Sequence, residues 1–266
     1  MARPMVKWLG AVSRSGGLLV TAAGIAIASP VVAQQGIDPE AGVILEAMSD
    51  HLRSMAAFTA DYDTDHEVID LAGQKIQYSA SGSIAADRAK GLRLTRKGPF
   101  ADAEMIFDGK TVSLYGKELN VYATLTSPGP TFEDAAEELR ASTGLDVPGA
   151  DFLAADPYAA LIEGATQGVV VGSAFVDGIA CDHLAFRTDM VDWQIWISKG
   201  AKPLPLKYVI TTKWVTGAPQ YSLRLTNWKP GAVDTAQFTF TPPAGAREVE
   251  HVYADVAGEV SLEAGE

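Results

Sequence analysis

The stretch from Ile179 to Trp228 constrains the fold most, because apolar residues occupy every second position in four successive segments. A β-strand points successive side chains to opposite faces, so this alternation is typical of strands with one buried face. Breaks at 189–191, 200–203 and 217–219 separate the segments. Connections this short join antiparallel neighbours, so the stretch predicts a four-stranded antiparallel meander.

One segment of the meander departs from simple alternation. Trp193, Ile195 and Ile197 share one face, whereas Trp196 places a further aromatic ring on the other. Both faces are therefore partly apolar, and we expect other parts of the chain to cover both. The pattern does not decide which face is turned inward.

The first 33 residues have the pattern of a secretory signal peptide. Three basic residues precede an apolar run, 16–28, that is too short to span a bilayer comfortably, although a membrane anchor is the alternative interpretation. Small residues before Gln34 predict cleavage after Ala33. Cys181 is the only cysteine and lies far from this position, so we expect a soluble periplasmic protein that is neither lipidated nor embedded in the membrane.

Removal of residues 1–33 makes the chain more acidic. The formal net charge falls from −12 to −15, because this segment holds three basic residues and no acidic one. Such a surface repels nucleic acid and anionic lipid headgroups, so we expect no nucleic-acid partner. A hydrophobic ligand taken into a cavity is not excluded.

Three segments outside the meander contain residues typical of helix ends. Asp38 and Pro39 begin a helix that we expect to extend to Ala56, and further helices are expected at 131–144 and 156–164. Outside the meander, strands are expected at 58–69, 76–84, 92–95, 105–107, 111–115, 119–125, 169–176 and 238–240.

This order predicts a mainly β (α+β) fold. We expect a single strongly curved antiparallel sheet or incomplete barrel of about 11 strands, with helices packed over its concave face. One domain would cover residues 34–250, followed by an acidic, flexible tail at 251–266.

Several segments carry a resemblance to a known family: MSDHL at 48–52, FDGKT at 107–111, GIACDH at 178–183, VDWQIWI at 191–197 and PLP at 203–205. From about Ile44 to Ala246 the chain resembles an uncharacterised family of predicted periplasmic bacterial proteins. That family is similar to the lipoprotein-carrier (LolA/LolB-like) fold, in which an incomplete antiparallel barrel around helices leaves an apolar cavity for acyl chains. The resemblance implies a periplasmic binder or carrier of a hydrophobic molecule, and it brings no set of functional residues.

Bulky apolar residues on the expected helices and strands are candidates to line such a cavity. They could equally form an ordinary core, in which methionine fills gaps. The candidates are Met48, Leu52, Met55, Phe132, Leu139, Trp193, Ile195, Trp196, Ile197 and Tyr208.

Catalytic and metal motifs are weak in this sequence. Cys181 and His183 point the same way on a strand, but no residue is placed to orient the imidazole, so we interpret both as structural. Asp61, Asp63 and Asp65 begin like a calcium loop, yet its glycine and its final glutamate are missing. We therefore expect no catalytic residues, no metal and no cofactor, and we do not expect an enzyme.

Three hypotheses remain. The first is a monomeric carrier of a lipid, acyl chain or lipidated protein, held between sheet and helices in a cleft that the protein's own side chains do not fill. The second is an envelope sensor or interaction domain that binds a partner protein without lipid, which an unpaired sheet edge or exposed apolar patch would favour. The third is a hydrolase, which would need histidine and carboxylate groups converging in a cleft.

Overall fold

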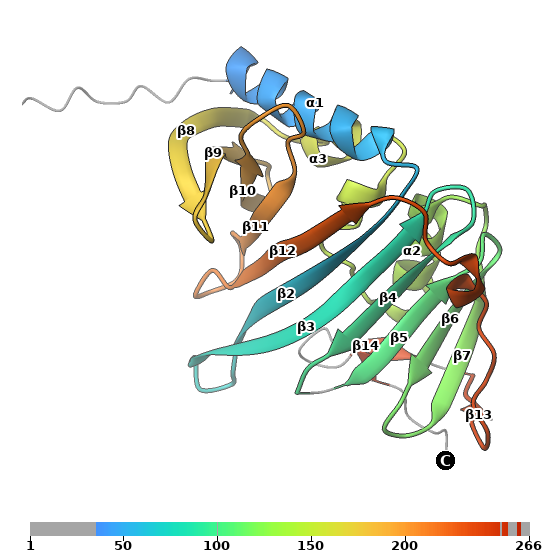
Figure 1. Cartoon of the computed structure of the whole chain (residues 1–266). Helices are drawn as coiled ribbons and strands as arrows, with labels where there is room; N and C mark the ends of the chain where they lie inside the picture. The colour runs from blue at the N-terminus through green and yellow to red at the C-terminus, as the bar shows by residue number, and fades with distance from the viewer. Residues whose placement is uncertain (1–35, 100, 251, 255–259, 262–266) are drawn as a thin grey trace, which may run out of the picture. The chain divides into compact units, whose positions relative to one another are not determined.

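The main sheet of the computed structural model runs in the order β1-β8-β9-β10-β11-β12-β2-β3-β4-β5-β6-β7-β13 (Figure 1). The structure describes residues 36–99, 101–250, 252–254 and 260–261, so the expected signal peptide lies outside it. The strands of the main sheet are β1 (Gly36–Ile37), β2 (Ala57–Ile69), β3 (Lys75–Asp87), β4 (Gly91–Lys97), β5 (Asp102–Phe107), β6 (Thr111–Gly116), β7 (Val121–Thr126), β8 (Gln167–Val176), β9 (Ile179–Arg187), β10 (Val191–Ser198), β11 (Pro205–Thr212), β12 (Gln220–Pro230) and β13 (Arg247–Glu248).

This arrangement confirms the predicted fold class. The sheet is curved and open, and its neighbours pair antiparallel except where β1 joins β8 and β13 joins β7. It has 13 strands rather than about 11, because the two-residue strands β1 and β13 pair at its two edges. In the expected tail, β14 (Tyr253–Ala254) pairs with β15 (Val260–Ser261).

The prediction of a strand at 238–240 is wrong. The short 3-10 helix η2 (Thr235–Phe238) takes its place, because the Asp234 carboxylate accepts a 3.0 Å hydrogen bond from the Ala236 amide and caps a turn. Two prolines follow at 242–243, and proline cannot donate to a ladder. Residues 238–240 therefore cross the sheet without pairing as a strand, and the chain joins the sheet only at β13.

The helices begin where their capping residues predict. Asp38 caps α1 (Pro39–Ser54), which ends two residues before the predicted end because β2 starts at Ala57. Thr131 and Asp134 form a reciprocal capping box at the start of α2 (Phe132–Thr143). The short helices η1 (Ala150–Leu153) and α3 (Pro157–Ile162) complete the insert between β7 and β8. No helix among the described residues is long and apolar enough to cross a membrane.

The two faces of the sheet differ sharply. The helix face packs against the helices in one apolar core, to which Phe58, Leu184, Trp193, Tyr208 and Leu223 contribute. The opposite side, here called the open face, carries the alternate positions of each strand. On β10, Trp193 and Ile195 belong to the helix face, and Trp196 belongs to the open face. The structure therefore supplies the orientation that the sequence left open.

Candidate functional site

The predicted ligand-lining residues divide between the two faces of the sheet. Trp196 is the exception that lies on the open face. The others belong to one core cluster on the helix face, where each is at most 8% exposed: Met48, Leu52, Met55, Phe132, Leu139, Trp193, Ile195, Ile197 and Tyr208.

These residues pack against one another. The ring of Trp193 stacks on Phe186 with centroids 4.2 Å apart, and Tyr208 meets Trp193 edge-on at 5.7 Å. The ring of Phe152, from η1, meets the ring of Tyr208 edge-on, with centroids 5.3 Å apart. Burial raises the pKa of the Tyr208 hydroxyl, as expected in an apolar surrounding. The protein's own side chains therefore fill the cleft that the first hypothesis expected to be open, and a ligand could occupy this interface only if the helices moved away from the sheet.

Arg88 links the end of α1 and η1 to the sheet, and no sequence pattern singled out this residue. It lies in the turn between β3 and β4 and donates hydrogen bonds to four backbone carbonyls. Two belong to η1 and the residue after it, Leu153 at 2.8 Å and Ala154 at 3.1 Å. The others belong to the end of α1, Leu52 and Met55, both at 3.3 Å.

The chemistry of helix-end carbonyls and of the guanidinium group explains these hydrogen bonds. The last carbonyls of a helix have no donor within the helix, and a guanidinium offers five N–H groups in a fixed plane. Burial lowers the pKa of the Arg88 guanidinium, and the nearby Glu133 carboxylate opposes that shift. Arginine remains protonated in proteins, so Arg88 acts as a charged hydrogen-bond donor.

Trp196 belongs to a row of side chains across the open face. Its indole stacks on His183 at 4.1 Å, and the ammonium of Lys207 lies 4.8 Å from its ring centre. The Nε2 atom of His183 is 2.9 Å from the side-chain oxygen of Gln194. These contacts hold Trp196 away from the helix–sheet interface.

Cys181 and His183 do not form a hydrogen bond with each other. The Cys181 thiol donates to the carbonyl of Ile179 at 3.3 Å, whereas His183 pairs with Gln194. Burial raises the pKa of the Cys181 thiol, which disfavours the thiolate that a nucleophile requires.

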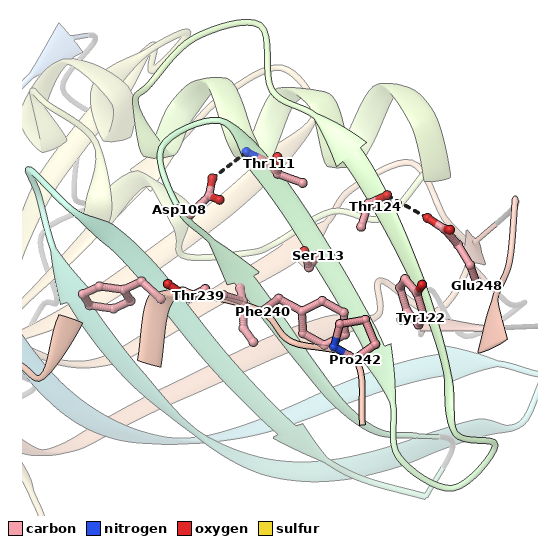
Figure 2. A pocket seen from close by; sticks show the side chains of 11 residues that line it. Asp108, Thr111, Ser113, Tyr122, Thr124, Thr239, Phe240, Pro242 and Glu248 are labelled. Atoms are coloured by element: carbon pink, nitrogen blue, oxygen red, sulfur yellow. Dashed lines mark hydrogen bonds between the residues drawn. The ribbon is translucent and has the colours of Figure 1, made fainter. Parts of the chain in front are cut away.

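A groove on the open face was not predicted. We call residues 235–248 the C-terminal strap, because this segment crosses β5, β6 and β7 and ends in β13 beside β7 (Figure 2). The groove between strap and strands has a volume of about 320 Å³. It is lined by Ile106, Asp108, Thr111, Ser113, Tyr122, Thr124, Phe238, Thr239, Phe240, Pro242 and Glu248.

The β8 edge of the sheet is largely uncovered. β1 pairs only with Gln167 and Gly168, at the start of β8. Further along the strand, Val169, Val171 and Phe175 are 38%, 54% and 74% exposed. The described structure therefore presents strand backbone and apolar side chains together at this edge.

Comparison with known protein families places the chain in a family. A family model described as a predicted periplasmic protein (DUF2092) matches residues 41–252. No curated protein sequence matches the chain.

Several solved structures are similar to the chain at low sequence identity. An uncharacterized conserved protein from Thermus thermophilus is 15% identical, with 80% of this chain and 99% of that chain covered and a TM-score of 0.48. LprF from Mycobacterium bovis is 14% identical, with 79% and 98% covered and a TM-score of 0.44. The LolA superfamily protein NE2245 from Nitrosomonas europaea is 10% identical, with 75% and 97% covered and a TM-score of 0.38.

Proposed function

Because the chain belongs to the predicted periplasmic family DUF2092, we propose that it acts in the periplasm as a binding or carrier protein for a hydrophobic ligand. The ligand would be a lipid, an acyl chain or a lipidated protein. It would lie between the helix face of the sheet and the covering helices, against Met48, Met55 and Trp193. The helices would move away from the sheet to admit it.

The observation that carries this proposal is the way that Arg88 attaches α1 and η1, here called the cover, to the sheet. Its hydrogen bonds join the end of α1 and η1 to the β3–β4 turn at a single point. Loss of this partly buried charged donor would cost about 2–4 kcal/mol, and its hydrogen bonds can break and re-form without unfolding a strand. Arg88 is thus a polar link between the cover and the sheet, beside the apolar core under α1 and the pairing of β1 with β8.

Burial of the ligand would offset part of the cost of opening the cover. Burial of an acyl chain gains about 0.8 kcal/mol for each CH₂, so about 14 buried groups would gain about 11 kcal/mol. This gain would offset the loss of the Arg88 bonds, about 2–4 kcal/mol, together with part of the apolar contacts that the cover gives up when it leaves the sheet. Met48 and Met55 line the same interface, and their flexible thioether chains adapt to ligands of different shape.

The test is titration with a fluorescent fatty acid whose emission rises in an apolar environment. We expect saturable binding to the wild-type protein and faster uptake by Arg88→Ala, because the cover opens more readily. Lys90→Ala, in the same turn and exposed, is the matched control and should bind like the wild type. Absence of saturable binding in all three proteins would count against the carrier role.

The β8 edge favours a second candidate function. An extended peptide from a partner protein could add a strand to β8 and cover Val169, Val171 and Phe175. The protein would then act as an envelope sensor or interaction domain that carries no lipid. The two candidates use different surfaces, so variants at Arg88 and at β8 separate them.

A further inference from the structure

The floor of the groove under the C-terminal strap is a patch of hydroxyl groups. Thr111 and Ser113 on β6 and Thr124 on β7 all face the groove, and Ser113 is the cross-strand partner of Thr124 (Figure 2). Within the described part of the chain, the hydroxyls of Thr111 and Ser113 make no hydrogen bond. The floor therefore offers donors and acceptors to a molecule that enters the groove.

A carboxylate lies on either side of this floor (Figure 2). One oxygen of Asp108 accepts hydrogen bonds from the amides of Lys110 and Thr111 at 2.9 and 2.8 Å. One oxygen of Glu248 accepts from the Thr124 hydroxyl at 3.1 Å. In each case the second oxygen has no hydrogen-bond partner among the described residues.

The charge of the groove selects the class of ligand. Its 11 lining residues include two carboxylates and no basic side chain. Anions are therefore disfavoured, and a cationic group gains from both carboxylates.

Aromatic rings form a wall next to the hydroxyl floor. Phe240 from the strap lies 5.4 Å from Tyr122 on β7, measured between ring centroids. Aromatic faces pack against apolar C–H surfaces and attract cations. The groove thus combines hydroxyls, carboxylates and rings in one place.

From this combination we infer that the groove binds an amino sugar with a free ammonium group. Such a ring has several hydroxyls for the floor, one cation for the free oxygen of Glu248, and an apolar C–H face for Phe240. The volume of about 320 Å³ lies at the lower end of the range for small-ligand sites, roughly 300–1,000 Å³. The groove is on the open face, so this site is independent of the proposed hydrophobic ligand.

Isothermal titration with three small molecules tests the inference. Glucosamine has both hydroxyls and an ammonium group, glucose has only hydroxyls, and putrescine has only ammonium groups. At equal ionic strength we expect glucosamine to bind about fivefold more tightly than glucose, as one added exposed ion pair would give. We expect it to bind more tightly than putrescine because only glucosamine has hydroxyls for the floor. Absence of saturable glucosamine binding, or equal affinity for glucose or putrescine, would overturn the proposal.

A pair of variants on the strap locates the site. Glu248→Gln keeps an acceptor for Thr124 and removes the charge, so glucosamine affinity should fall by about fivefold. Glu250→Gln, an exposed position two residues further along, should leave the affinity unchanged. Equal affinities for the two variants would place binding elsewhere and contradict the assignment.

Discussion

The guanidinium of Arg88 donates a 2.8 Å hydrogen bond to the backbone carbonyl of Leu153, 65 residues further along the chain. Further bonds from the same side chain reach Leu52 and Met55 at the end of α1. One residue of a sheet turn thus holds two covering segments over the core. The carrier proposal depends on how firmly it does so.

Replacement of Arg88 by alanine should lower the free energy of unfolding by about 2–4 kcal/mol, because four partly buried carbonyls lose their donor. Lys90→Ala removes an exposed side chain from the same turn and should change the free energy of unfolding by less than about 0.5 kcal/mol. Urea denaturation of both variants measures the difference. Equal stability of the two variants would show that Arg88 does not fasten the cover.

Asp151 should make stability depend on pH. Burial raises the pKa of its carboxyl, and the Glu163 carboxylate acts in the same direction. The folded chain therefore holds this proton more tightly than the unfolded chain, so the contribution to stability is full at acid pH and is lost as the pH rises through the folded pKa. Asp151→Asn avoids this loss and should be more stable than the wild type at pH ~7.

The stability gap between Asp151→Asn and the wild type should shrink as the pH is lowered. Urea midpoints at neutral and acid pH measure the gap. Asp146→Asn, an exposed change close by, serves as the control and should produce no such trend. A stability difference that widens at acid pH would show that the raised pKa of Asp151 is not its cause.

Two glycines should respond oppositely to alanine. A Cβ on Gly82 of β3 would lie 1.9 Å from the carbonyl oxygen of Thr95 and 2.5 Å from the Tyr62 ring. Gly82→Ala should therefore cost at least about 2–3 kcal/mol, as overpacking does. Gly42 in α1 has no neighbour closer than 3.5 Å, so Gly42→Ala should stabilise the protein by about 0.5–1 kcal/mol. Thermal unfolding of both variants checks the opposite signs.

The β8 edge makes a prediction for the interaction-domain alternative. Val171→Lys places a charge beside the free edge, and charged residues on edge strands oppose the addition of another strand. If a partner peptide binds there, capture of periplasmic proteins by Val171→Lys should fall, with stability unchanged. Val43→Lys, an exposed valine on α1, is the control. Equal capture by both variants would remove β8 as the binding surface.

The sequence predicted the meander because the two-residue period of a strand appears directly in the order of residues. β9, β10, β11 and β12 lie where alternation placed them. The same reasoning placed Trp196 among the lining candidates, because an aromatic residue on each face fits either orientation. The structure shows that this ring belongs to the open face, where it stacks on His183 of β9.

Other features depend on contacts between distant segments. Arg88 resembles any basic residue in a turn, and its partners at Leu52 and Leu153 follow only from the packing of α1 and η1. Residues 238–240 were predicted as a strand because Phe238 and Phe240 alternate, but η2 and the prolines redirect the chain across the sheet. The Glu248–Thr124 contact, which spans 124 residues, has no local pattern that could predict it.

Native mass spectrometry of the protein purified from a periplasmic extract, followed by organic extraction and lipid analysis, tests whether it carries a hydrophobic ligand. The carrier proposal predicts a fraction of molecules with added mass and an extractable acyl species that accounts for it. A clean mass of the protein alone, with no uptake of added fatty acid or phospholipid, would contradict the proposal and favour partner binding at β8.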